Sequence, residues 1–172
     1  EGVFPELFKV AKVIPLHKSG STLSVTNFRP ISLLPILSKI FEILIFNRLI
    51  SFLTKYNVIS NYQYGFQANK STELAVHAII SNVIKCFEDK ETAYGIFLDF
   101  AKAFDTVDHK ILLKKLHHYG IRGFPLKLFE SYLSSRKQYT EIENTLSEWN
   151  HIYYGVPQGS VLGPILILIY IN

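Results

Sequence analysis

The sequence contains no methionine and only one cysteine, Cys86, among its 172 residues. A lone cysteine cannot form an internal disulfide, so we expect an intracellular, reducing compartment (nucleus or cytoplasm) rather than secretion. The longest apolar stretch, from Val161 to Ile171, is shorter than the roughly 20 residues that a membrane helix needs. The missing methionine, together with an end inside that apolar stretch, indicates a piece of a longer protein.

Charge is also sparse, because charged residues make up only 19% of the sequence while hydrophobic residues make up 48%. This balance excludes a disordered chain and favours one globular domain with a substantial core. The net charge of +4 permits a nucleic-acid partner without requiring one. Aromatic residues, at 14%, suit base stacking as well as core packing.

Three common catalytic signatures are missing. The Asp-x-Asp of many phosphatases is broken by Ala101, and Lys18 lacks the preceding glycine of a P-loop. Ser160 directly follows Gly159, so the Gly-x-Ser-x-Gly elbow of hydrolases is absent. These absences argue against a phosphatase-type aspartate nucleophile, a P-loop and a hydrolase elbow.

Hydrophobic periodicity predicts both helices and strands, with some strands joined as hairpins. We expect the helix that Ser71 or Thr72 caps to bury one apolar side, and Asp108 to cap the helix that ends before Gly120. The expected helices cover residues 36–56, 71–87, 108–119 and 125–132, and another follows residue 164. The expected strands cover residues 8–16, 27–34, 96–100, 138–143 and 149–154.

The central feature is a carboxylate, Asp99, inside the apolar run 96–100, with Asp105 one short turn later. A buried acid costs several kcal/mol unless something positive meets it. Mg²⁺ prefers oxygen ligands and often takes one or two protein carboxylates, so a metal site is one interpretation. An ordinary structural interpretation stays equally open, in which Asp99 ends the strand and Asp105 caps the next helix.

Two further features are able to hold a phosphate or a nucleotide. Lys18 and Arg29 flank a polar Gly/Ser turn between two extended segments, where two cations can grip a phosphate chain. The Gly- and Pro-rich residues 155–164 include Gln158 and lead into a helix, so backbone N–H groups there can bind an anion. Solvated surface cations and an ordinary helix cap are the structural alternatives.

Taken together, four segments resemble the motifs of reverse transcriptases from non-LTR (LINE-type) retrotransposons. Residues 97–109 (Phe-Leu-Asp-Phe-Ala-Lys-Ala-Phe-Asp-Thr-Val-Asp-His) resemble the first catalytic motif, and residues 155–164 (Gly-Val-Pro-Gln-Gly-Ser-Val-Leu-Gly-Pro) resemble the next. Residues 27–33 resemble a fingers motif, and residues 64–73 resemble another. The likeness covers nearly the whole chain, in the family's order.

The resemblance implies an α+β right-hand polymerase with helices packed on an antiparallel sheet. Its fingers and connecting helices would cover residues 1–93, and a partial palm would cover residues 94–172. It implies an RNA-directed DNA polymerase that uses an RNA template, a DNA primer, dNTP and two Mg²⁺ ions, with Mn²⁺ as a possible substitute. The implied metal ligands are Asp99 and the carbonyl of Phe100. The implied nucleotide-binding residues are Lys18, Arg29, Gln158, Gly159 and Phe104, the last as a gate against the ribose 2′-OH, with Asp105 in a supporting role.

One departure from the family matters for activity. The Tyr/Phe-Ala-Asp-Asp turn that supplies further metal ligands in the family is not in these 172 residues, which end at Asn172. We therefore expect the chain alone to be truncated before that hairpin and to be inactive. The alternative is a non-catalytic retroelement remnant that acts at most as an RNA- or protein-binding fold. The sequence leaves the oligomeric state open.

Overall fold

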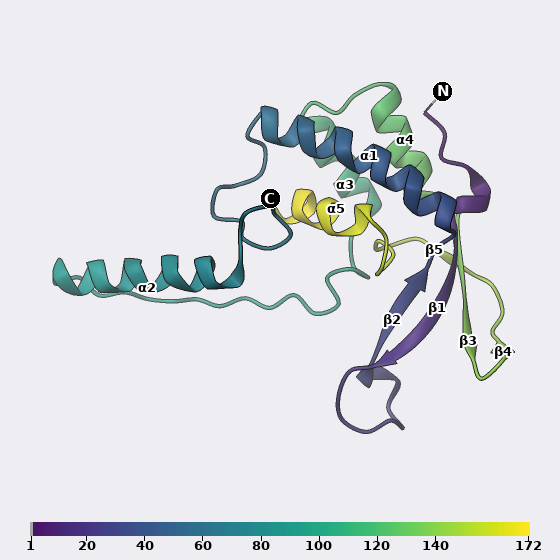
Figure 1. Ribbon diagram of the computed structural model, residues 1–172, viewed down its shortest axis with the longest axis horizontal. Helices are drawn as coiled ribbons and strands as arrows, with labels where there is room; N and C mark the ends of the chain where they lie inside the picture. The colour runs from purple at the N-terminus through teal and green to yellow at the C-terminus, as the bar shows by residue number, and fades with distance from the viewer. Residues whose placement is uncertain (1) are drawn as a thin grey trace.

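The computed structural model describes residues 2–172, which form an α+β fold. Its helices and strands lie in clearly separate regions, with most of the helices gathered above the sheet and one extending away (Figure 1). The α-helices are α1 (Ile36–Lys55), α2 (Thr72–Glu88), α3 (His109–His118), α4 (Phe124–Leu133) and α5 (Leu162–Ile171). The strands are β1 (Val10–His17), β2 (Phe28–Leu33), β3 (Arg136–Ile142), β4 (Thr145–Leu146) and β5 (Asn150–Ile152), and the 3₁₀ turns are η1 (Glu6–Phe8) and η2 (Val25–Asn27).

The sheet is mixed rather than wholly antiparallel, which corrects one detail of the expected α+β fold. Its order is β2-β1-β3-β4, with β5 also paired to β3. The β1–β2, β3–β4 and β3–β5 pairs are antiparallel, but β1 runs parallel to β3. A parallel pair needs a long crossover, and the chain supplies one because four helices lie between these strands.

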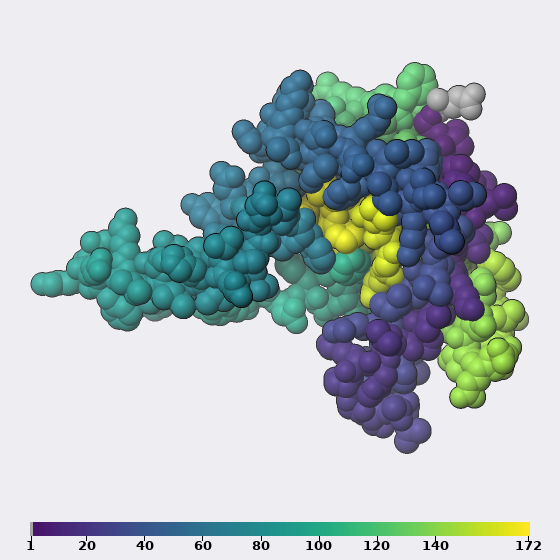
Figure 2. Space-filling model, in the orientation of Figure 1, coloured from purple at the N-terminus to yellow at the C-terminus, as the bar shows by residue number. Residues whose placement is uncertain are grey.

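The core is built around α5. Seven of its ten residues are buried, and its own side chains are apolar on every side of the helix. This is the pattern expected of a fully enclosed helix. It packs against α1 and α3, while α4 packs against α3. In Figure 2 the helix (yellow) lies under the α1 side chains (blue). Within residues 2–172, no helix is both long and apolar enough to cross a membrane.

Both predicted N-terminal caps are confirmed. The Asp108 carboxylate accepts hydrogen bonds from the backbone N–H groups of Lys110 (2.8 Å) and Ile111 (3.0 Å), at the start of α3. The Ser71 hydroxyl accepts from the N–H of Leu74 (3.2 Å) at the start of α2. Such caps satisfy helix N–H groups that have no partner within the helix, so local sequence defined these two starts.

The predicted central strand over residues 96–100 is wrong for the described structure. These residues are extended but belong to no strand, and the side chains of Ile96, Phe97 and Leu98 are 80–87% exposed. A strand needs a neighbour to take its backbone hydrogen bonds, and no described residue pairs with this segment. Asp99 is therefore exposed rather than buried in a strand.

The predicted buried side of α2 is also wrong. None of its residues is buried, and Leu74, Ile79, Ile80 and Phe87 are about half exposed or more. The helix projects from the body, and the extended segment that follows it runs back alongside (Figure 1). The apolar periodicity correctly predicted the helix, but the described chain provides no layer to cover its apolar side.

Candidate functional site

The Gly- and Pro-rich residues 155–163, which we call the turn, lie directly against the segment that follows Asp99. The N–H of Gly155 donates to the carbonyl of Val107 (2.8 Å), and the N–H of Val156 donates to the carbonyl of Phe104 (2.7 Å). A Cβ at Gly155 would lie 2.7 Å from the Phe104 carbonyl oxygen. Glycine therefore permits a close approach of two backbones that brings both sequence motifs together.

The middle of the turn contacts both β2 and Asp105. The N–H of Ser32 on β2 donates to the carbonyl of Gln158 (2.7 Å), and the Gln158 side-chain amide donates to Asp105 Oδ1 (2.9 Å). Gly159 has a φ of +112°, and a Cβ there would lie 2.8 Å from the Ser32 carbonyl oxygen. The turn is thus hydrogen-bonded both to β2 and to the segment that follows Asp99, which links three segments predicted to contribute to one site.

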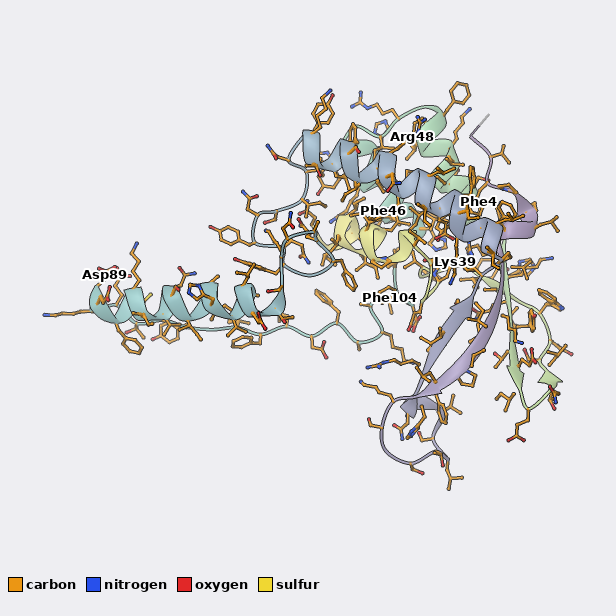
Figure 3. All side chains as sticks on the ribbon, viewed as in Figure 1. Phe4, Lys39, Phe46, Arg48, Asp89 and Phe104 are labelled. Carbon is orange, nitrogen blue, oxygen red and sulfur yellow. The ribbon has the colours of Figure 1, made fainter. Side chains whose placement is uncertain are left out.

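Phe104 lies where the segment returning from α2 reaches the helical body (Figure 3). It is half-buried, and its ring meets the edge of Phe66, with 6.4 Å between the ring centroids and 83° between the planes. This T-shaped arrangement is a favourable aromatic geometry. Sequence reasoning did not single out Phe66, although it lies within one of the quoted motif segments, residues 64–73.

Lys18 and Arg29 are both exposed on the β1–β2 hairpin. Arg29 pairs with Leu16, and the N–H of Lys18 donates to the carbonyl of Asn27 (2.8 Å), which continues the ladder. Alternation along a strand places Lys18 and Arg29 on one face of the hairpin, diagonally rather than directly opposite. Arg29 also shares β2 with Ser32, which bonds to the turn.

Asp99 and Phe100 lie on the exposed extended segment rather than beside the turn. Among residues 2–172, no hydrogen bond or ion pair holds the Asp99 carboxylate. The same residues contain no group of three or more His, Cys, Asp or Glu side chains placed to hold a metal ion. The structure therefore brings together Phe104, Asp105, Gln158 and Gly159, and leaves Asp99 unattached.

A large groove lies elsewhere, between α1 and α4. Its volume is about 1070 Å³, and Phe52, Phe124 and Phe129 are among its lining residues. None of the predicted site residues lines it. The groove is therefore separate from the residues that the motifs identify.

One functional candidate that the sequence analysis did not identify is Glu42, on the helix expected over residues 36–56. Glu42 lies on the buried side of α1 and is fully buried. Burial raises the pKa of this carboxyl, while hydrogen bonds from Leu162 and Val161, the charge of Arg136 and a hydrogen bond from Ser38 oppose the rise. Helical periodicity places Glu42 on the same side of α1 as the buried Leu49 and Leu53. An acid at such a position was the sequence signal for a buried polar contact.

Comparison with known proteins defines the class. Residues 16–172 match the family described as reverse transcriptase (RNA-dependent DNA polymerase). The chain is 39% identical to the RNA-directed DNA polymerase from mobile element jockey and 37% identical to the probable RNA-directed DNA polymerase from transposon BS. Both relatives are from Drosophila melanogaster, and the alignments cover 98% and 97% of this chain, respectively.

The chain belongs to the reverse transcriptase family, and the resemblance to the enzymes of non-LTR retrotransposons is confirmed. A third relative, the probable polymerase from transposon X-element of the same fly, is 34% identical over 97% of the chain. The chain spans only 18% of the length of each of these three relatives. Activity, substrates and partners of a whole protein are therefore matters for proposal.

The family generally uses a divalent metal, but the described residues do not by themselves fit such a site. A site for two dications needs several carboxylates to offset their mutual repulsion. Asp99 is the implied ligand, and no acidic cluster accompanies it within residues 2–172. The described chain is suited to supply part of a metal site and not the whole.

Proposed function

We propose that this chain forms the nucleotide-binding part of an RNA-directed DNA polymerase, which transfers a nucleotide from dNTP to a DNA primer 3′-OH on an RNA template. Residues 1–93 would contribute the fingers and connecting helices, and residues 94–172 part of the palm. The hydrophobic core joins α1 to α3, α4 and α5, so these two parts share one core rather than folding as separate bodies.

One observation supports this function above the others: the contact of Gln158 with both Asp105 and Ser32. It brings the β2 segment, the segment following Asp99 and the glycine turn to one place, although they are far apart in sequence. Each of the three resembles a different motif of the family. Burial of apolar surface alone would not require contacts among these polar segments.

The proposed roles follow from this arrangement. Phe104 would contact the sugar, while Gln158 and Gly159 would line the nucleotide and template site. Lys18 and Arg29, on the exposed hairpin face, would hold the triphosphate as paired cations. Asp105 would act indirectly, because its carboxylate accepts a hydrogen bond from Gln158 and so orients that side chain.

Asp99 and the Phe100 carbonyl would provide metal ligands, with Mg²⁺ as the expected ion and Mn²⁺ as a substitute. Bound metal would supply charge stabilisation for the attacking and leaving oxygens of nucleotide transfer. Because the described residues do not complete that site, the roles of the other site residues concern nucleotide binding and orientation. The remaining ligands would have to come from other residues.

The direct test is primer extension by a full-length protein that contains this chain. With an RNA template, a DNA primer, dNTP and Mg²⁺, we expect DNA synthesis that depends on both the template and the metal. Omission of the template serves as the control. Binding of RNA or protein without any synthesis would contradict the proposal and favour the non-catalytic alternative.

Replacement of Phe104 by alanine should weaken the discrimination between dNTP and NTP. The phenyl ring would no longer block the ribose 2′-OH, and relief of such a steric conflict is expected to change the ratio of kcat/KM values by about 10- to 100-fold. The measurement is single-nucleotide incorporation with each dNTP and its matching NTP.

Phe66→Ala provides the matched control, because it removes the ring that packs on Phe104 and leaves the proposed gate in place. It should change sugar discrimination much less than Phe104→Ala does. An unchanged dNTP/NTP ratio in Phe104→Ala would show that Phe104 only packs against its neighbours.

Lys18→Ala and Arg29→Ala should each raise the KM for dNTP. Loss of one charge-assisted contact to phosphate is expected to cost about 1.5–3 kcal/mol, or roughly 10- to 100-fold. Steady-state kinetics at a saturating primer–template concentration measures the effect. Lys39→Ala, on α1, is the control for removal of a positive charge. If Lys18→Ala and Arg29→Ala weaken only the affinity for primer–template, these residues contact the nucleic-acid phosphate backbone and not the triphosphate.

A further inference from the structure

A polar cluster interrupts the buried side of α1. Ser38 and Glu42 are fully buried, and Ile45, Leu49 and Leu53 continue the same side of the helix with apolar residues. The Ser38 hydroxyl lies 3.3 Å from Glu42 Oε1 and 3.2 Å from the Phe8 carbonyl oxygen, and can donate to either. Glu42 therefore extends from α1 into the interior of the protein, where one of its carboxylate oxygens can accept a hydrogen bond from Ser38.

The other carboxylate oxygen reaches the turn. Glu42 Oε2 accepts hydrogen bonds from the N–H groups of Val161 (2.8 Å) and Leu162 (3.1 Å), about 120 positions later in the chain. The N–H groups of a first helical turn have no partner within the helix, and their end carries partial positive charge. Next to them, the Ser160 hydroxyl accepts from the N–H of Gly163 (3.0 Å), so the start of α5 is fully capped.

This arrangement has an energetic cost that points to a specific role. A buried carboxylate is unfavourable unless hydrogen bonds and opposite charge compensate for lost hydration. The buried Arg136, at the start of β3, contributes the positive charge. Its Nη1 donates to the Tyr132 carbonyl (3.1 Å), and its guanidinium group lies over the Tyr132 ring. An apolar side chain would join α1 to α5 without this cost, but it could not fix the backbone N–H groups of the turn.

Those N–H groups lie close to the residues proposed to meet the nucleotide. Gln158 and Gly159 precede Val161 by only three and two positions, and Gln158 is also hydrogen-bonded to β2 and to Asp105. The turn is thus fixed at its start by Val107, in its middle by Ser32 and at its end by Glu42. A shift at the Glu42 end would move the nucleotide-facing residues.

We propose that Glu42 is a positioning residue, which sets the location of Gln158 and Gly159 by holding the Val161 and Leu162 N–H groups from α1. The proposal rests on the proposed function in one respect, that the turn lines the nucleotide site. Glu42 touches neither substrate nor metal in this role. It acts entirely through the backbone of the turn.

Hydrogen exchange tests the contact without any need for activity. In a full-length protein that contains this chain, Glu42→Leu removes the acceptor while keeping a side chain of similar size. Exchange across residues 156–163 should become at least about tenfold faster, because two N–H groups lose their partner. Glu42→Gln retains an oxygen that can accept from both groups and should stay near the wild-type rate.

Kinetics tests the consequence for nucleotide binding. Glu42→Leu should lower kcat/KM for dNTP by about 10- to 100-fold, since small displacements of positioning groups have effects of this size, with little change in primer–template affinity. Glu42→Gln should restore the value to within a few-fold. Leu49→Ala is the matched control, because it creates a cavity on the same side of α1 but removes no hydrogen-bond acceptor from the turn. Below the melting temperature of this variant, kcat/KM should stay near the wild-type value.

The outcomes separate this inference from the proposed function. Wild-type exchange across residues 156–163 in Glu42→Leu, or an equal kinetic loss in Leu49→Ala, would overturn the role of Glu42. Absence of DNA synthesis by the wild-type protein would overturn the proposed function, while the exchange comparison would still test the contact. If Glu42→Leu does not fold, Glu42→Asp replaces it, because the charge stays but the shorter side chain loses its reach, and wild-type exchange there would equally overturn the role.

Discussion

Asp99→Asn, in a full-length protein that contains this chain, should lower RNA-templated DNA synthesis by more than about 100-fold. Loss of a partner that merely orients a metal ligand already costs 10- to 100-fold, and this change removes the charge of the proposed ligand itself. The Asp99 side chain is exposed and makes no hydrogen bond or ion pair among residues 2–172, so the fold should be unaffected. Primer extension with Mg²⁺ measures activity, and circular dichroism checks the fold.

Two other aspartates provide controls for Asp99. Asp89, which follows α2, is exposed and lies outside every motif, so Asp89→Asn should leave synthesis unchanged. Asp105→Asn should cost less than about tenfold, since the new amide oxygen still accepts a hydrogen bond from Gln158, only a weaker one. Equal losses at Asp99 and Asp105 would contradict the roles proposed for them.

The 172-residue chain by itself should show no detectable RNA-templated DNA synthesis and should aggregate. Residues 2–172 do not gather the carboxylates of a metal site. They also expose two apolar surfaces, the side of α2 and the extended segment that contains Ile96, Phe97 and Leu98. Large contiguous apolar patches promote association, and an extended segment with unpaired backbone groups invites pairing with other chains.

Size-exclusion chromatography with light scattering, together with primer extension, measures both properties. A chain with Ile96→Ser and Phe97→Ser should form less aggregate, because these side chains are exposed and contribute no core packing. A Leu112→Ser variant should form more, since Leu112 is fully buried in the core. Templated synthesis by a monomeric 172-residue chain would show that the metal site has been placed wrongly.

Local sequence was sufficient for the helices and their caps. The helix expected over residues 36–56, the Ser71 and Asp108 caps, and the extended hairpin on either side of the Gly/Ser turn are all confirmed. Each depends on residues within one or two turns of one another. The same reasoning failed for residues 96–100 and for the buried side of α2, because pairing and burial depend on neighbours that periodicity cannot supply.

The sequence by itself also determined the family, because the motif residues and their order are properties of the chain. Only the tertiary structure decided which of those residues meet. The contact between Gln158 and Asp105 joins positions 53 apart, and the one between Glu42 and Val161 joins positions 119 apart. Such contacts depend on how α1, α5 and the β1–β2 hairpin pack around a common core, and no local pattern of hydrophobic or capping residues specifies that packing.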